Sequence, residues 1–134
     1  MLFRSANVAT MAAGRVVLGE IFTAEVAEAH TARGEKFRSE LAEVLAAHAL
    51  PLSVTGYGSS MTVHARDTAP DNAAEVAERD PALQELIFLG LYRRGIYVAP
   101  RGMINLSLAV TDAQLRTALE ALDDTLSDLS RSLA

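Results

Sequence analysis

The stretch "RRGIYVAPRGMINLSLAVTDAQL" (residues 93–115) decides the fold class, because it combines two apolar runs with the start of a helix. Residues 96–99 and residues 104–108 are short runs with apolar residues at alternate positions, and the turn sequence "PRG" separates them, which predicts two strands. Thr111 and Asp112 follow with side chains that can cap a helix. The stretch therefore predicts a strand pair that leads directly into a helix.

Helices are predicted on both sides of this strand pair. Pro81 suits the first position of a helix, which should run to Arg94 and end at Gly95. The helix after the strands carries apolar residues three or four positions apart, as expected for one buried stripe. Its members are Leu115, Leu119, Leu122, Leu126 and Leu129.

The first half of the chain predicts two more helices. Residues 7–22 are rich in Ala, Val and Leu, with Ser5 or Asn7 as the cap, and their apolar side chains lie nearly all round, as in a helix buried on several sides. Thr23 caps a second helix, which should run to about Ala49 and stop before Pro51. Its later half carries one buried stripe, namely Phe37, Leu41, Val44, Leu45 and His48.

The middle of the chain predicts two further strands. In "LSVTGYGSSMTVHARD" (residues 52–67), short β-rich runs are broken by Gly56 and Gly58, which indicates two strands with a bend. Residues 67–80 hold Pro70, Asn72 and many charges, and we expect an exposed loop with a helical turn. The whole chain, residues 1–134, is therefore expected to be one α+β two-layer domain, with helices packed on a small, mainly antiparallel sheet.

Composition limits the possible partners. The 134 residues carry a net charge of −5 with acidic and basic residues interspersed, whereas a nucleic-acid surface needs concentrated basic charge. No apolar run approaches the roughly 20 residues that span a membrane, and the first 20 residues make a poor signal peptide. The absence of cysteine excludes disulfides and thiolate metal sites. We expect a cytoplasmic protein without nucleic-acid or membrane partners.

Four motifs occur in an order that points to a known family. They are "SANVATMAAG", "GEKFRSEL", "VTGYGSSMTV", and "RRGIYVAPRG" followed by "LSLAVTDAQL". Together they resemble the C-terminal part of class III aminotransferases, the fold-type I enzymes that use pyridoxal 5′-phosphate. The glutamate-1-semialdehyde aminomutase branch is the most similar. The likeness covers nearly all of the chain.

The resemblance implies the small C-terminal domain of such an enzyme, with residues 1–22 similar to the interdomain helix. In the family, a large N-terminal domain supplies most cofactor contacts, including the Schiff-base lysine. We therefore expect this chain alone to bind no pyridoxal phosphate and to be inactive. The family also usually has a Thr four residues before the Asn matched by Asn7, where it reaches the cofactor phosphate of the partner subunit. Phe3 stands there, and its ring has no hydrogen-bond donor.

No residue of the chain is predicted to be catalytic. Lys36, the only lysine, neighbours Glu35 and lies four residues before Glu40, so an exposed, charged ammonium is expected rather than a Schiff-base amine. The three histidines lie in different elements without metal-ligand spacing. No metal site is therefore expected.

Three residues are candidates for substrate binding. Arg101, in the "APRG" turn, is nearest in position to the arginine with which many class III enzymes hold a substrate carboxylate. A solvated turn residue is the favoured interpretation, because turn charges normally face solvent. Ser59 and Ser60 lie in "TGYGSS", which reads better as a strand bend than as a phosphate loop because it lacks the Lys and the helix. In an intact enzyme these serines would border the active-site entrance.

The most favoured function is thus the C-terminal domain of an aminotransferase or aminomutase, whose partner is a missing large domain, a separate chain or a second copy. One alternative is a free-standing binding or dimerisation module that keeps the fold without the reaction. Another is a ferredoxin-like sandwich that binds a small regulator. Residues 7–22 distinguish the aminotransferase function from the alternatives. In an intact enzyme the large domain covers them, so without that domain their apolar face should be bare and prone to self-association.

Overall fold

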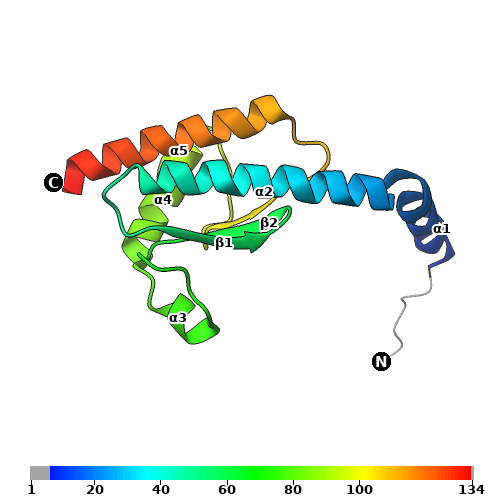
Figure 1. The fold of residues 1–134 in the computed structure, drawn as a ribbon, viewed down its shortest axis with the longest axis horizontal. Coiled ribbons are helices and arrows are strands. Elements are labelled where there is room, and N and C mark those ends of the chain that lie inside the picture. The colour runs from blue at the N-terminus through cyan, green and yellow to red at the C-terminus, as the bar shows by residue number, and fades with distance from the viewer. Residues whose placement is uncertain (1–6, 134) are drawn as a thin grey trace.

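The computed structural model describes residues 7–133 and has the predicted α+β architecture (Figure 1). Its elements, in chain order, are α1 (Val8–Val16), the π-helical turn η1 (Val17–Ile21), α2 (Ala24–Ala46), β1 (Ser53–Tyr57), β2 (Ser60–His64), α3 (Ala73–Ala77), α4 (Pro81–Arg93), β3 (Met103–Asn105) and α5 (Asp112–Leu133). The prediction of helices packed on a small sheet is confirmed. The chain predicted as a single domain has one hydrophobic core in the described residues.

The sheet has three antiparallel strands in the order β1-β2-β3. The bend predicted between residues 52 and 67 is a two-residue hairpin turn, Gly58-Ser59, because Tyr57 pairs with Ser60. Gly58 has φ +55° and Ser59 has a negative φ, the pattern of a type II′ turn, which requires glycine at its first central position. This meander differs from the strand arrangement of the ferredoxin-like alternative.

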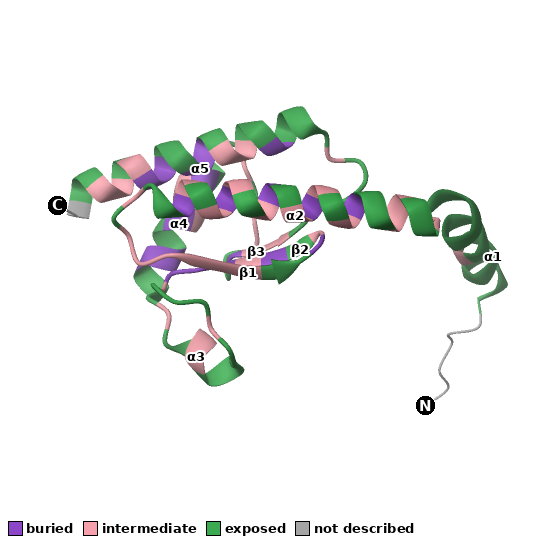
Figure 2. Cartoon of the chain, in the orientation of Figure 1, coloured by how far each residue is buried: buried purple, intermediate pink, exposed green. Residues whose placement is uncertain are grey.

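One face of the sheet forms the core with α2, α4 and α5. The figures show α2 and α5 running alongside each other over the sheet, with their buried residues turned toward it (Figures 1 and 2). The predicted stripes of both long helices are confirmed, since every member of each stripe is buried or partly buried. The core residues are Phe37, Leu41, Leu45, Met61, Val63, Ala65, Leu83, Ile87, Leu91, Leu115, Ala121, Leu122 and Leu126.

Helix boundaries follow the predicted caps. The Asn7 side chain accepts from the Ala9 N–H at 3.0 Å, and Thr23 Oγ1 accepts from the Val26 N–H at 3.4 Å. Thr111 caps α5 through the Gln114 N–H, while Asp112 is the first helical residue rather than a cap. Ser5 and Phe3 lie outside the described residues.

Two boundaries differ from the prediction. Helix α2 ends at Ala46 rather than near Ala49, because the Ala47 N–H is shared between the Glu43 and Val44 carbonyls and the His48 N–H bonds only three residues back, to Leu45. The strand predicted at residues 104–108 is the shorter β3, because β2 begins at Ser60, opposite Asn105, and beyond this pair the chain makes one more bond to the hairpin, from the Leu106 N–H to the Ser59 carbonyl.

The strand predicted at residues 96–99 is wrong for this chain. Its burial alternates as in a strand, with Ile96 and Val98 partly buried and Tyr97 73% exposed. Its backbone, however, reaches the neighbouring strand only through the Ala99 N–H, which donates to the Met103 carbonyl at 3.3 Å. Propensity for β structure does not make a strand without a ladder of partners.

Helix α1 and the turn η1 form an arm that projects from the body at one end of α2 (Figure 1). No residue of the arm is buried, so the expectation of a helix buried on several sides is wrong within this chain. The bare apolar face is confirmed: its members are Val8, Met11, Val16, Val17, Leu18 and Ile21. Only contacts with other polypeptide could cover them.

The hairpin tip lies against the backbone of α2. A Cβ atom on Gly34 would lie 2.1 Å from the Gly58 carbonyl oxygen, far inside van der Waals contact. Glu35, the next residue, accepts a hydrogen bond from the Gly58 N–H at 2.6 Å. The "GEKFRSEL" motif therefore seats the β1–β2 hairpin on the helix through one glycine and one carboxylate.

We predict that Gly34→Ala lowers the free energy of unfolding by about 2–3 kcal/mol, because the new methyl group must displace the hairpin backbone. Gly14→Ala is the matched control, since nothing lies within 4 Å of a Cβ at Gly14. That helix-interior change should be neutral or stabilising by up to about 1 kcal/mol. Urea unfolding of both variants measures this, and equal midpoints for the two would contradict the close contact.

Candidate functional site

The turn that carries Arg101 is held rigidly against β2. The Gly102 N–H donates to the Ala99 carbonyl at 2.8 Å, and the Gly102 carbonyl accepts from the Val63 N–H at 3.0 Å. Gly102 has φ +87°, and a Cβ there would lie 2.1 Å from the Val63 carbonyl oxygen. Only glycine fits this position, so the backbone that presents Arg101 is fixed by its neighbour.

Arg101 borders an open hollow of about 490 Å³ between this turn and the start of α4. Two guanidinium groups, one carboxylate and one amide line it, and an aromatic ring and two prolines form its apolar walls. The lining residues are Arg79, Pro81, Gln84, Glu85, Phe88, Pro100 and Arg101. Paired guanidiniums suit a carboxylate and the nearby carboxylate suits an amine, so the hollow has the chemistry to hold a small amino acid.

Gln84 is the buried polar group of this hollow. Its side chain is only 5% exposed, and its Oε1 accepts from the Ala65 N–H at 3.2 Å. That bond ties α4 to the end of β2 and fixes the direction of the amide. Sequence reasoning missed Gln84, Arg79 and Phe88, because residues on one helix and the preceding loop meet Arg101 only through tertiary packing.

Ser59 and Ser60 lie at the hairpin tip. The Ser59 carbonyl accepts from the Leu106 N–H at 2.8 Å, which joins the tip to the chain beyond β3. Ser60 is exposed and pairs with Asn105. The pKa of Glu35, which holds the tip, is lowered by hydrogen bonds from Arg38 and from the Gly58 N–H, so the carboxylate stays charged in its role as acceptor.

The strand register places Ser60 and the Arg101 contact on one side of the sheet. Residues paired directly across antiparallel strands share a face, and the face opposite the core is rich in polar side chains. It carries Ser53, Thr55, Tyr57, Ser60, Thr62, His64, Met103 and Asn105. The Arg101 guanidinium donates to Met103 Sδ at 3.7 Å, so Arg101 reaches this polar face at the margin of β3.

The three histidines serve separate structural roles. His30 Nε2 lies 3.1 Å from the Leu106 carbonyl oxygen, and His48 Nε2 pairs with Asp123 at 2.8 Å at the end of the α2 stripe. His64 lies on the outer face of β2 and is nevertheless buried. Among residues 7–133, no cluster of His, Asp or Glu side chains has an arrangement that could hold a metal ion.

Lys36 does not fit the role of an imine-forming amine. Its side chain is 78% exposed, and Nζ lies 3.7 Å from Glu40 Oε1, which is the ion-paired helix face predicted from sequence. A Schiff-base lysine needs a desolvated or electrostatically tuned amine. Lys36 is the only lysine, and its exposed, ion-paired amine lacks the environment that such a site requires.

No helix in the described part of the chain has the length and hydropathy to cross a membrane.

No family model matches the sequence. Individual proteins do match. A β-phenylalanine transaminase from Variovorax paradoxus is 37% identical over 116 residues, which make up 87% of this chain and 27% of the relative. A glutamate-1-semialdehyde 2,1-aminomutase from Nitratidesulfovibrio vulgaris is 32% identical over 87% of this chain and 28% of the relative.

Solved structures agree with these matches. The crystal structure of the Variovorax enzyme superposes with a TM-score of 0.86 at 35% identity, covering 92% of this chain and 29% of that one. A glutamate-1-semialdehyde aminomutase from Pseudomonas aeruginosa, solved in complex with PMP, shares the fold with a TM-score of 0.82 at 22% identity. The chain thus spans about a quarter of the length of its curated relatives.

We predict that Lys36 forms no lasting imine with pyridoxal phosphate, because its amine is exposed and paired with Glu40 rather than desolvated in a pocket. The chain would be incubated with the cofactor, reduced with borohydride and digested, and the Lys36 peptide examined by mass spectrometry. We expect the Lys36 peptide to be labelled no more than the N-terminal amine of a Lys36→Arg chain. A stoichiometric adduct on Lys36 that survives dialysis before reduction would contradict this reading.

Proposed function

The homologues of this chain are class III, pyridoxal-phosphate-dependent aminotransferases, and we propose that it acts as the C-terminal domain of such an enzyme. The observation that carries the proposal is the continuous match over 87% of the chain at 37% identity. The cofactor and its lysine then belong to the larger remainder of the enzyme, joined to this sequence or supplied by a partner chain. Without that remainder the chain is inactive.

In this role Arg101 binds the carboxylate of the substrate. The hollow beside it supports this, because Arg79 adds a second cation and the Gln84 amide lies between the turn and α4. Glu85 on the same wall suits the amino group of an amino acid, and Phe88 suits an apolar side chain. A merely solvated Arg101 is the alternative, and it would leave catalysis unchanged when substituted.

The hairpin tip forms the second part of the proposed wall. Ser59 and Ser60 would border the entrance of the active site, on the polar face that Arg101 also reaches. The contacts of Gly34 and Glu35 with Gly58 keep the tip from moving when substrate enters. The domain therefore positions substrate and limits access of water, while the chemistry takes place on the rest of the enzyme.

The arm formed by α1 and η1 is the proposed junction with that remainder, in keeping with the resemblance of residues 1–22 to an interdomain helix. Its apolar residues face solvent in this chain, with Val8 80% and Leu18 69% exposed. A run of this kind on a soluble domain marks a contact surface. The same arm supports the second candidate, a binding or dimerisation module.

A chimera tests the proposed function. The matched quarter of the Variovorax β-phenylalanine transaminase would be replaced by this chain, and the product assayed for transamination of β-phenylalanine. Activity is expected, and Arg101→Gln should lower kcat/KM by about 10- to 100-fold through loss of a charge-assisted contact. Arg93→Gln, at the exposed end of α4, is the control and should change little.

The chimera separates two failures. A folded chimera that binds the cofactor yet cannot transaminate would count against the domain assignment. An active chimera in which Arg101→Gln and Arg93→Gln behave alike would leave the assignment standing and exclude Arg101 from carboxylate binding.

The isolated chain should self-associate through the arm. We predict a species heavier than the 14.3 kDa monomer in sedimentation velocity, with a concentration-dependent distribution. Leu18→Glu should shift it toward monomer because the carboxylate opposes burial of the apolar face. Leu108→Glu changes an exposed apolar residue outside the arm and should not. A monodisperse wild-type monomer at high concentration would refute the prediction.

A further inference from the structure

The segment between β2 and α4, residues 66–80, projects from the body and carries the short helix α3 (Figure 1). We call it the α3 segment. Its two ends meet at the sheet, where the Asp80 N–H donates to the Ala65 carbonyl at 2.9 Å. None of its residues is buried, so it contributes nothing to the hydrophobic core.

Side-chain hydrogen bonds and ion pairs hold the α3 segment together. The Arg66 guanidinium donates to the Glu75 carbonyl at 3.0 Å and to Glu75 Oε2 at 3.3 Å, and lies 3.6 Å from Glu78 Oε2. Asn72 caps α3 through two backbone N–H groups. A segment with few apolar contacts and solvent-facing bonds opens at a lower free energy than the core.

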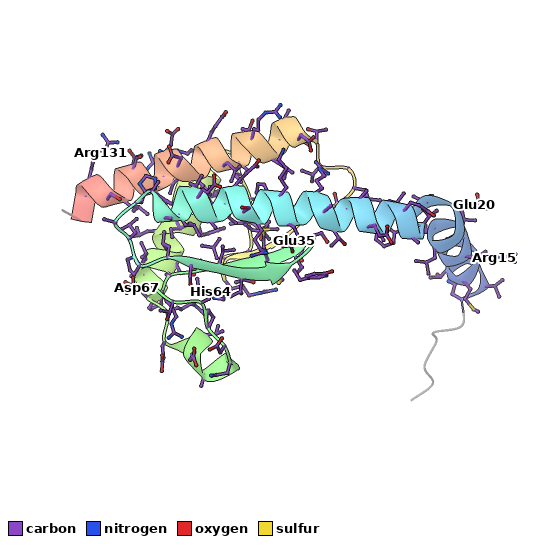
Figure 3. All side chains as sticks on the ribbon, in the orientation of Figure 1. Arg15, Glu20, Glu35, His64, Asp67 and Arg131 are labelled. Atoms are coloured by element: carbon purple, nitrogen blue, oxygen red, sulfur yellow. The ribbon has the colours of Figure 1, made fainter. Side chains whose placement is uncertain are left out.

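His64 lies at the base of the α3 segment (Figure 3). It ends β2 on the outer face of the sheet, where only 5% of its surface is exposed. Its Nε2 lies 2.8 Å from Thr55 Oγ1, which leaves the ring held by β1 in a fixed orientation. No other hydrogen bond to this ring is formed by residues 7–133.

The charged groups that act on His64 are two arginines, and one of them, Arg66, is itself paired with Glu75 and Glu78. Arg66 follows it on the same strand and Arg79 comes from the far end of the α3 segment. Strand β1 offers only the hydroxyls of Ser53 and Thr55, and the carboxylate of Asp80, at the start of α4, is engaged by the N–H groups of Ala82 and Leu83. Burial first, and then the charges of Arg79 and Arg66, hold the pKa of His64 below its usual value.

We propose that the α3 segment is a pH-operated cover, which opens when protonation of His64 places a third positive charge beside Arg66 and Arg79. The closed segment buries a neutral imidazole and tolerates both arginines. A charged imidazole gains by being exposed to water and by losing Arg79, so it favours the open state. The core below does not need to unfold, because the segment shares no buried residue with it.

The direction of the effect follows from linkage. The open segment binds the proton more readily than the closed one, so the opening constant rises as pH falls through the range where an exposed histidine titrates. At pH 5 the rise cannot exceed about 30-fold, because pH 5 lies about 1.5 units below the ordinary histidine pKa of about 6.5. Arg79 also lines the hollow beside Arg101. Opening of the α3 segment would therefore remove one of the two guanidinium groups that line this hollow.

Hydrogen exchange of the full chain tests the cover. Amide exchange would be followed at pH 7.5 and pH 5.0 and corrected for the intrinsic pH dependence. We expect opening of residues 72–79 to increase by about 3- to 30-fold at pH 5.0, while α2 and α5 stay protected. His64→Gln should abolish the increase, and His48→Gln, at the far end of α2, should keep it. An NMR titration of the wild-type His64 ring should give the same midpoint as the opening.

Each other outcome would overturn the proposal. An equal increase in His64→Gln would assign the effect to Glu75 and Glu78 instead. Loss of protection across the whole chain would mean global unfolding, and no increase in the wild type would mean no switch. If His64→Gln does not fold, the wild type still provides a test. A pH midpoint of the His64 ring in the NMR titration that differs from the pH midpoint of opening in hydrogen exchange refutes the mechanism.

Discussion

The contact of two glycines, Gly34 on α2 and Gly58 at the hairpin tip, is the constraint on which the rest of the structure depends. A side chain at Gly34 would overlap the Gly58 carbonyl, and the Gly58 N–H is taken by Glu35. This contact sets how closely the hairpin approaches the helix, and so it sets which strand residues reach the core. Because register in a sheet decides the face of every residue, it also determines that the serine and threonine side chains of β1 and β2 point away from α2.

A second glycine contact repeats this arrangement at the other side of the sheet. Gly102 lies against the Val63 carbonyl and fixes the turn that presents Arg101. The two contacts hold the hairpin tip and the arginine turn relative to one framework of strands. A site that must bind a substrate in one orientation benefits from loops held in this way, since less conformational entropy is lost on binding. The hollow beside Arg101 is therefore shaped by backbone contacts that lie outside it.

The surface has two chemically distinct regions, namely the polar outer face of the sheet and the apolar arm. The arm has no covering polypeptide among the described residues, whereas the outer sheet face is hydrophilic and accepts water without penalty. In the proposed function, the arm is the surface where the larger part of an enzyme docks, and the polar face is where substrate and solvent meet. His64 is the exception on this face, because it is buried although it lies on the outer side of β2, with the charges of Arg79 and Arg66 acting on it.

The sequence by itself determined the helices, their caps and the buried stripes, since these depend on local spacing and on side chains such as Thr23 and Pro81. It also indicated Lys36 as an exposed, ion-paired residue, because both partners lie on one helix. Only the tertiary structure decided that residues 96–99 form no strand and that Arg79, Gln84 and Phe88 meet Arg101. Those features depend on which distant segment supplies the partner for a backbone group or an apolar face. Local sequence limits the secondary structures that a segment can adopt, but pairing with distant segments decides which one it adopts and which side chains it brings together.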